Sequence, residues 1–349
     1  MGEKIKLASI HAQEPDLPAG ANPEESIYDL DLLRCHKQSC IDKMCSLLNE
    51  AGCQGADLVC THECFEGSGI GAIDYEKPDL YALLTETIPG PISERLSAIS
   101  RKHAMNIVAN YHEREGRSVY NTSVLLDRKG NISGKYRKIH LPAREKWSVT
   151  AGREFTVLQS DVGQIGFAIC YDMCFTEHCR AMALNGANII IHQTMGWGFT
   201  SNRMGEALLR TRAADNCVYL IVAKNIQDIN ADYGKSCVID NNGEILAEAG
   251  GKEEKIVMAE FVPDFDRIDK DGYNTLFSGM ENTRLRNLLE REPQLYQILA
   301  NPNPPVMKQY AGLELDTATA EGIARIYAKW RQYEADIAAG KPVERHFHW

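Results

Sequence analysis

Apolar positions along the first 262 residues alternate between two spacings, one typical of helices and the other of strands. Between residues 36 and 51 they recur at Cys40, Met44 and Leu48 with apolar neighbours, which is the spacing of one helix face. Short apolar runs of strand length, bounded by turn-forming residues, lie between such stretches. The first half is therefore predicted to hold strands at 4–10, 57–61, 106–111, 119–127 and 132–138, and helices at 36–51 and 92–103.

The second half repeats this order. An apolar run ends at Ile169, and further strands are predicted at 188–193 and 218–224. Helical spacing predicts helices at 177–185, capped by Gly186, and at 202–216. A hairpin then turns at Asn241-Asn242-Gly243. Because strands that alternate with helices form βαβ crossovers, we predict an α/β fold, a four-layer α-β-β-α sandwich over residues 1–262.

Residues 263–349 lack this alternation. Prolines at 263, 293, 302, 304 and 305 interrupt the segment, and helical spacing returns at 284–289 and 321–337. We therefore divide the chain into a domain at 1–262 and a C-terminal extension at 263–349 that wraps the core or a partner subunit. Apolar residues without a core of their own need a surface to cover, so we predict a homodimer or a higher homo-oligomer.

Charge and composition narrow the classes of partner. The net charge of −10 and the pI of about 5.5 disfavour nucleic acid and anionic membrane surfaces. The sequence has no run of about 18 apolar residues, so no membrane span is predicted. Its first ten residues lack the apolar stretch of a signal peptide. We expect a cytoplasmic protein whose partner is a small molecule.

The 11 cysteines are an odd number spread over the chain, which favours reduced thiols over a disulfide framework. Those at 170, 174 and 179, and those at 53, 60 and 64, are close in sequence. Neither set has the paired C-x₂-C spacing of structural zinc sites. The sequence therefore predicts neither a metal nor another cofactor.

Three predicted strand ends carry reactive groups. Glu63 follows the strand at 57–61, Lys138 closes the strand at 132–138, and Cys170 follows the apolar run that ends at Ile169. Taken singly, such charges are typical of solvated surface groups, and a cysteine is most often a small buried hydrophobe. Ligands of α/β proteins bind at the carboxyl edge of the sheet, however. A carboxylate, an ammonium and a thiol that meet there would supply a base, an oxyanion partner and a nucleophile.

The segments around these residues resemble motifs of the nitrilase or carbon–nitrogen hydrolase superfamily. The similar segments are Tyr136-Arg137-Lys138-Ile139-His140-Leu141, Ile169-Cys170-Tyr171-Asp172 and Arg212-Ala213-Ala214-Asp215-Asn216. The resemblance covers about residues 4–262, and its motifs are specific when taken together. It implies a Glu-Lys-Cys triad on an α-β-β-α sandwich, with residues 1–262 as the catalytic domain.

By this resemblance, Cys170 is the nucleophile and Glu63 is the general base and acid. Lys138 would stabilise the tetrahedral intermediate, together with the backbone N–H of Tyr171 just after the nucleophile. The resemblance also assigns Glu145, which would orient Lys138 and contact the substrate nitrogen. A solvated loop charge, or Glu154 in the same role, also fits that segment.

The chain departs from the family pattern at His62 and Thr176, where relatives commonly have proline. Both changes bear on the shape of the pocket, although a hydrogen-bonded scaffold role is the favoured alternative for His62. For the apolar residues that follow the strand at 188–193, the alternative to lining the pocket is packing in the core. The substrate-pocket candidates are His62, Met173, Cys174, Gln193, Met195 and Trp197, with Phe199 close by.

Cys170-Tyr171-Asp172 resembles the amidase and carbamoylase branches, whereas nitrile-cleaving members have Cys-Trp-Glu. We therefore predict hydrolysis of a non-peptide amide or N-carbamoyl (ureido) compound through a covalent thioester on Cys170, releasing ammonia or an amine. Carbamoyl amino acid hydrolases place an arginine where this chain has Met173 and Cys174, and only Arg144 or Arg203 offers a substitute. The alternatives are nitrile hydrolysis, acyl transfer to an amine, and a catalytically silent interaction protein.

Overall fold

The computed structural model describes most of the chain up to residue 306. The described residues are 3–18, 29–67, 84–142, 145–196, 202–226, 235–268, 276, 278–302 and 304–306, with single positions at 325, 328 and 332. The expected helix at 321–337 therefore lies almost wholly outside the described residues.

The first half of the chain and the later strand β12 together form a six-stranded sheet. In the strand order β12-β1-β2-β3-β4-β5, the central strands β1, β2 and β3 run parallel, and the other pairings are antiparallel. The strands are β1 (Ile5–Gln13), β2 (Leu58–Cys60), β3 (Asn106–Glu115), β4 (Ser118–Leu126), β5 (Ile132–Arg137) and β12 (Lys255–Phe261).

The second half repeats this arrangement in the order β6-β7-β8-β9-β10-β11, with β7, β8 and β9 parallel. The two sheets join where β1 pairs with β9 at Ala12–Asn225 and Gln13–Ile226. The strands are β6 (Val157–Ser160), β7 (Gly163–Ile169), β8 (Ile189–Thr194), β9 (Tyr219–Ile226), β10 (Ser236–Ile239) and β11 (Ile245–Ala249).

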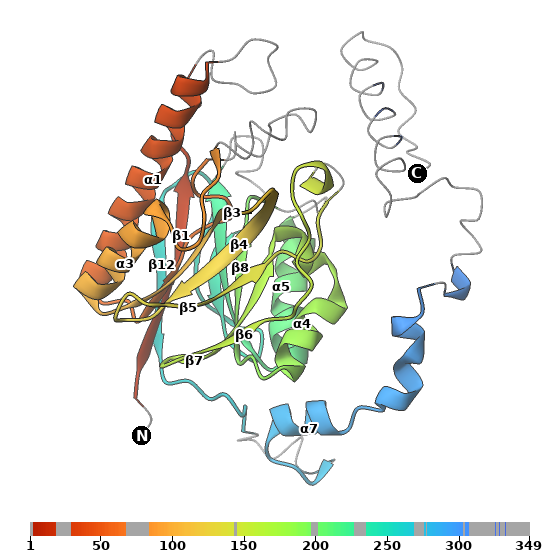
Figure 1. Cartoon of the computed structure of the whole chain (residues 1–349). Coiled ribbons are helices and arrows are strands. Elements are labelled where there is room, and N and C mark those ends of the chain that lie inside the picture. The colour runs from red at the N-terminus through yellow and green to blue at the C-terminus, as the bar shows by residue number, and fades with distance from the viewer. Residues whose placement is uncertain are drawn as a thin grey trace.

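Helices cover the outer face of each sheet, which confirms the predicted four layers (Figure 1). Helices α1 (Leu30–Cys53) and α3 (Pro91–His103) cover the first sheet, and α4 (Thr176–Leu184) and α5 (Asn202–Asn216) cover the second. The apolar face read from the sequence is the buried one, because Met44, Leu48 and Leu96 pack in the core beneath the first pair. A second core cluster contains residues of both sheets, among them Leu58 and Phe167.

Most predicted elements are present, and the differences have local causes. Helix α1 begins at Leu30, not at 36, because the Asp29 side chain caps it by accepting from the backbone N–H groups of Asp31 and Leu32. Strand β3 extends beyond 111 because its antiparallel pairing with β4 continues to Glu115 and Ser118. Helix α5 has the predicted bounds.

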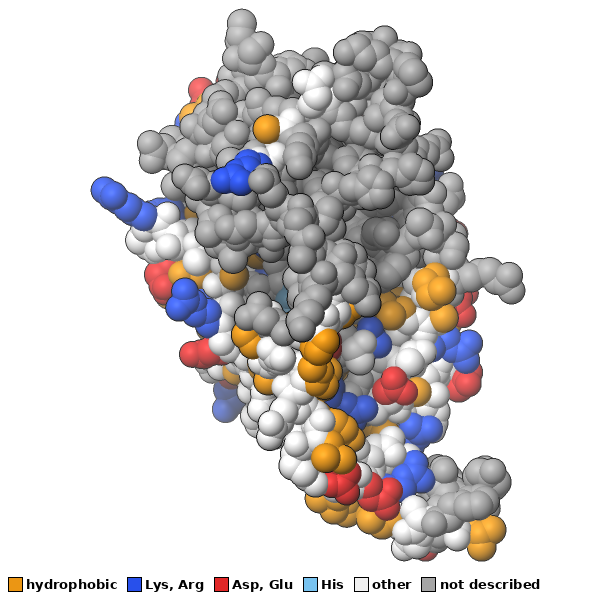
Figure 2. Space-filling model, turned by 90° about the vertical axis from the view of Figure 1, so that its right-hand side faces the viewer, with side chains coloured by type: hydrophobic (Ala, Val, Ile, Leu, Met, Phe, Trp, Pro, Cys, Tyr) orange, Lys and Arg blue, Asp and Glu red, His pale blue; other side chains and the backbone are white. Residues whose placement is uncertain are grey.

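The beginning of the C-terminal extension packs on the second half. The backbone N–H of Asp264 donates to the Tyr219 hydroxyl at 3.0 Å. In α7 (Thr283–Leu289), Arg284 donates to the carbonyls of Cys217 and Ala187 at 2.8 and 2.7 Å. Apolar side chains on this extension are exposed, and Figure 2 shows hydrophobic groups on the face that carries it. They include Leu276, Leu289, Leu295, Ile298 and Leu299.

None of the helices in the described part of the chain is long and apolar enough to cross a lipid bilayer.

Candidate active site

Glu63 lies in the loop after β2 and is 3% exposed. Its Oε1 accepts from Lys138 Nζ at 2.8 Å and from Asn121 Nδ2 at 3.0 Å. Its Oε2 accepts from the backbone N–H of Met195, just after β8, at 3.0 Å. The carboxylate is therefore fixed by groups from both sheets, as a base with a defined direction of proton transfer requires.

Lys138 directly follows β5 and lies between two glutamates. It is 2% exposed, and its Nζ is 2.8 Å from Glu63 Oε1 and 2.7 Å from Glu145 Oε2. An ammonium has three N–H donors, so one is left after these two contacts for a developing oxyanion. The structure thus brings Glu145, in the 3-10 helix η2 (Glu145–Trp147), to the lysine that it was expected to orient.

The loop that carries Glu145 is attached to the strand end that carries Lys138. The Gly152 backbone N–H donates to the Lys138 carbonyl at 2.7 Å. A Cβ at Gly152 would come within 2.1 Å of the Arg137 carbonyl oxygen, so a larger residue would push the loop away. A glycine at 152 therefore allows the close approach on which the contact between Glu145 and Lys138 depends.

Cys170 begins the 3-10 helix η3 (Cys170–Cys174) directly after β7. Its φ of +43° is in the left-handed region, which a residue with a Cβ adopts at a cost of about 1–3 kcal/mol. The half-buried thiol donates to the Gly196 carbonyl at 3.8 Å, and Glu63 and Lys138 lie close enough to act on its pKa. This sharp turn presents the sulfur to the base.

The protonation states of the resting site follow from burial and charge. Burial opposes ionisation of Glu63, but the Lys138 charge and the hydrogen bonds outweigh it and hold the pKa of Glu63 below its usual value. Burial also opposes the charged form of Lys138, yet Glu145 and Glu63 raise its pKa well above the usual value. For Cys170, burial and the Glu63 carboxylate raise the thiol pKa to about 12. The resting site therefore holds a thiol beside a carboxylate, and sulfur becomes nucleophilic only as Glu63 takes its proton.

Two supporting residues were not singled out from the sequence. Asn121, on β4, donates to Glu63 Oε1 at 3.0 Å and to Glu145 Oε1 at 2.8 Å, and so links the two glutamates. Little in the sequence indicated this role, because Asn121 lies in a predicted strand next to two other polar residues, Thr122 and Ser123. Because the amide nitrogen carries two N–H donors, Asn121 serves both carboxylates at once.

The other supporting residue is Asp172, two positions after the nucleophile and fully buried. It accepts from the Tyr136 hydroxyl at 2.7 Å, from the Ile169 backbone N–H at 3.0 Å and from the His140 backbone N–H at 2.9 Å. These contacts join the turn that carries Cys170 to the strand end that carries Lys138. Its residue type was visible in the Cys-Tyr-Asp segment, but this bridging role was not.

Two of the pocket candidates face the protein interior. Gln193 is 1% exposed and lies between the sheets, where it accepts from Ser123 Oγ at 2.5 Å and donates to the Thr61 carbonyl at 2.9 Å. Met173 is fully buried in the core, and its sulfur is 3.5 Å from Cys179 Sγ. The expectation that both line the pocket is corrected, because strand alternation and the η3 turn direct these side chains inward.

The remaining candidates are placed as follows. His62 is buried, donates from Nδ1 to the Glu63 carbonyl at 2.9 Å, and has its pKa lowered to about 4 by burial, which fits the scaffold role. Cys174 is exposed at the end of η3. Tyr171 is the second residue of η3, so its backbone N–H has no acceptor within that helix. Trp197 and Phe199, like Arg144, lie outside the described residues.

This constellation supplies each group that acyl transfer through a thioester needs. It contains a thiol, a carboxylate close enough to raise the pKa of that thiol, and two N–H donors for an oxyanion. Glu63 and Lys138 extend from one sheet and Cys170 extends from the other, so the site lies where the two halves of the fold meet.

Comparisons with known proteins agree with this geometry. Residues 28–265 match the sequence profile of a family described as carbon–nitrogen hydrolase. The chain is 32% identical over 237 residues to the omega-amidase NIT2 of Homo sapiens, a match that covers 64% of this chain and 83% of that protein. The bovine omega-amidase NIT2 matches with the same identity and coverage.

Solved structures with the same fold include Nit3 of Saccharomyces cerevisiae, a member of branch 10 of the nitrilase superfamily. It has a TM-score of 0.59 and 25% identity, and the match covers 74% of this chain and 90% of that one. A double mutant of the amidase from Nesterenkonia sp. AN1, in complex with acrylamide, has a TM-score of 0.62 and 21% identity. That match covers 84% of this chain and 96% of the amidase.

Proposed function

This chain belongs to the carbon–nitrogen hydrolase family, and from that premise we propose that it hydrolyses a non-peptide amide through a covalent thioester on Cys170. The observation that carries the proposal is the buried Glu63 carboxylate, which contacts the Lys138 ammonium at 2.8 Å and lies close enough to the Cys170 thiol to raise its pKa. The similarity to omega-amidases supports an amide as the substrate class.

In the first half of the reaction, Glu63 removes the thiol proton as sulfur attacks the amide carbon. The carbon–sulfur bond forms, and the carbonyl oxygen becomes an oxyanion that the Lys138 ammonium and the Tyr171 backbone N–H stabilise. The carbon–nitrogen bond then breaks, and Glu63 returns its proton to the leaving nitrogen. Ammonia or an amine departs and leaves an acyl thioester on Cys170.

In the second half, Glu63 takes a proton from water, and the oxygen attacks the thioester carbon. The same donors hold the second oxyanion, the carbon–sulfur bond breaks, and Glu63 returns the proton to sulfur. The acid product leaves and the resting thiol is restored. Glu145 contributes by holding Lys138 in place at 2.7 Å and by accepting from the substrate nitrogen.

The side chains just after Cys170 favour a substrate that presents no carboxylate to them. Met173 is in the core and Cys174 is a neutral exposed thiol, so neither supplies the cationic fork that pairs with a carboxylate. We therefore propose simple amides and N-carbamoyl amines ahead of N-carbamoyl amino acids.

Ammonia release, screened over matched amides, N-carbamoyl amines and N-carbamoyl amino acids, tests this proposal. We expect turnover with the first two classes and weaker turnover when a carboxylate is added. Nitriles belong in the same screen, and product analysis with and without an added amine separates hydrolysis from acyl transfer. No ammonia from any of these compounds would favour a catalytically silent protein.

We propose that the extension from Pro263 covers a second subunit. Exposed leucines on 276–299 support this, because isolated apolar groups gain stability when they leave water. Light scattering at micromolar concentration should give the mass of a dimer or a larger assembly. A mass of about 39 kDa would count against the proposal.

We also propose a reducing, cytoplasmic location for the protein. All 11 cysteines are free thiols, including the exposed Cys35, Cys53 and Cys174. Exposed thiols persist where the compartment is reducing.

Chelators should leave turnover unchanged. The proposed reaction draws its nucleophile, base and oxyanion donors from Cys170, Glu63 and Lys138, so that no step needs a Lewis acid. The initial rate after incubation with EDTA and desalting, compared with the untreated enzyme, checks this. Loss of activity that added zinc restores, with no change in the melting temperature, would contradict the mechanism.

A further inference from the structure

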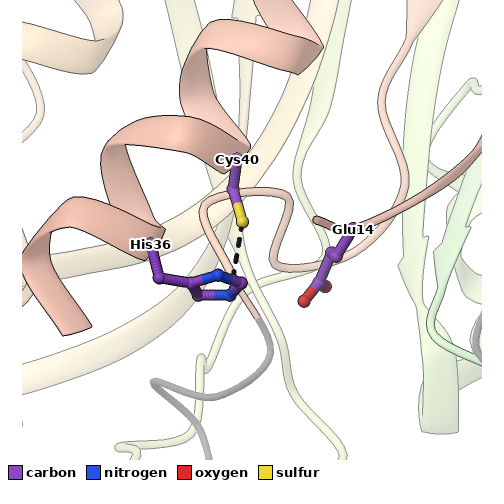
Figure 3. A group of neighbouring side chains, drawn as sticks. All are labelled: Glu14, His36 and Cys40. Atoms are coloured by element: carbon purple, nitrogen blue, oxygen red, sulfur yellow. Dashed lines mark hydrogen bonds between the residues drawn. The ribbon is translucent and has the colours of Figure 1, made fainter. Parts of the chain in front are cut away.

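A second group of reactive side chains lies where the end of β1 meets helix α1. It consists of Glu14, His36 and Cys40 (Figure 3), whose ligand atoms all lie within 4.8 Å of one another. They offer a carboxylate oxygen, an imidazole nitrogen and a thiol sulfur. His36 and Cys40 are buried and Glu14 is half-buried. The proposed reaction uses none of the three.

The spacing of the two helical residues suits a tetrahedral metal ion. His36 and Cys40 are four positions apart and therefore share one face of α1. His36 Nε2 lies 3.5 Å from Cys40 Sγ. Zinc bonds of about 2.3 Å to sulfur and about 2.0–2.1 Å to nitrogen, at a tetrahedral angle, would separate these atoms by about 3.6 Å. The two donors therefore need little movement. Glu14 follows the last residue of β1, and its Oε1 accepts from Asn225 Nδ2 on β9 at 2.5 Å.

The imidazole is oriented as a ligating histidine is. Besides the contact of Nε2 with Cys40, the ring makes a hydrogen bond to the backbone of Asp16. Metal-bound histidines usually donate their other ring N–H to such a backbone carbonyl or to a carboxylate.

The space and the charge fit one small cation. A cavity of about 10 Å³ lies beside Cys40 and Glu14, on the side of the group away from His36, and has room for a single water. The nearby Glu66 pairs through Oε1 with His112 at 2.6 Å, and its buried Oε2 has no hydrogen-bond partner. Lys43 also lines the cavity, but its ammonium pairs with Glu254 at 2.5 Å.

We propose that Glu14, His36 and Cys40 bind one Zn²⁺ ion, with a water in the cavity as the fourth ligand. Sulfur and nitrogen donors select zinc over Mg²⁺ or Ca²⁺, which prefer oxygen. On binding, the Cys40 thiol releases its proton to solvent and forms the zinc–sulfur bond. The ion links the end of β1 to α1. His62 lines the same cavity, so this site adjoins the loop of Glu63 without touching the reacting atoms.

Zinc titration against a chromophoric chelator tests the site without any turnover assay. The metal-free protein, carrying Cys170→Ser to remove the nucleophilic thiol, should bind one equivalent of Zn²⁺. Cys40→Ser and His36→Gln should weaken binding by more than the about 10–100-fold that loss of an outer-sphere partner costs. Cys45→Ser is the matched control, because Cys45 is buried on the same helix outside the group.

Two further readouts keep the test decisive if a buried variant unfolds. Glu14→Gln changes a half-buried loop residue and should weaken zinc binding in a folded protein. Co²⁺ in place of zinc should give a thiolate charge-transfer band that persists in Cys45→Ser and disappears in Cys40→Ser. Zinc should raise the melting temperature of the parent but not of Glu14→Gln. Equal zinc affinity in the parent, Glu14→Gln and Cys40→Ser would overturn the proposal.

Discussion

Cys170→Ala is expected to abolish turnover and to leave the protein folded. In the proposed reaction the Cys170 sulfur forms the thioester, and Glu63 lies close enough to this thiol to raise its pKa. The thiol is half-buried and its removal costs little packing, so the melting temperature should change by only a few degrees. Turnover and the thermal melt, measured on the same preparation, check both parts.

Cys174→Ala is the matched control for this experiment. Cys174 lies on the same 3-10 helix and is exposed, so the change removes a nearby thiol without touching the base. It should keep near-normal turnover. Cys170→Ser should be inactive too, because a hydroxyl is harder to deprotonate than a thiol. More than a trace of activity in Cys170→Ala would reject the nucleophile assignment.

Lys138→Ala is expected to lower kcat by about 10²–10³-fold, the usual effect of losing one oxyanion donor. The Michaelis constant should change less, since the ammonium acts on charge that develops in the transition state. Lys138 also separates Glu63 from Glu145, so its loss leaves two buried carboxylates without their cation. Breaking such a buried pair destabilises a protein by about 3–5 kcal/mol, and kcat must therefore be measured on the folded fraction.

The pH profile distinguishes the electrostatic role of Lys138 from a loss of folded protein. The Lys138 charge lowers the pKa of Glu63 against the opposing effect of burial. Without it, Glu63 should stay protonated to higher pH, and the acid limb of kcat/KM should move to higher pH. Lys138→Arg should restore part of the stability but not the full rate, because a planar fork does not replace a compact ammonium.

Lys135→Ala is the control, since Lys135 is on β5 and pairs with Glu113 and Glu115, outside the site. It should leave kcat and the pH profile unchanged. Near-normal turnover in folded Lys138→Ala would show that Lys138 forms a structural ion pair and does not stabilise the oxyanion.

The sequence was most informative where a residue's role depends on its place at a strand end. The strand-edge rule placed Glu63, Lys138 and Cys170 each at the carboxyl end of a strand, and the family resemblance implied that they meet across the two sheets. The two-fold repeat of β-α-β-α-β-hairpin was also readable, since apolar spacing changes between strand and helix. These features are local in the chain or follow from a general rule of topology.

Contacts between distant segments were not predictable from local pattern. Asn121 joins the two glutamates, and Asp172 joins the turn of Cys170 to the strand end of Lys138, only because β4, β5 and η3 converge. Gln193 was misplaced for the same reason. Its position after a strand suggested a pocket wall, but its amide satisfies buried polar groups between the sheets.

The most direct test of the account is the mass of the protein during turnover. Enzyme mixed with an amide that it turns over is quenched in acid, and the intact mass and peptide masses are measured. The account predicts an added acyl group, located on the peptide that contains Cys170 and absent from Cys170→Ala. An acyl group on a different residue, or rapid turnover with no acyl-enzyme at any quench time even when hydrolysis is slowed, would contradict it.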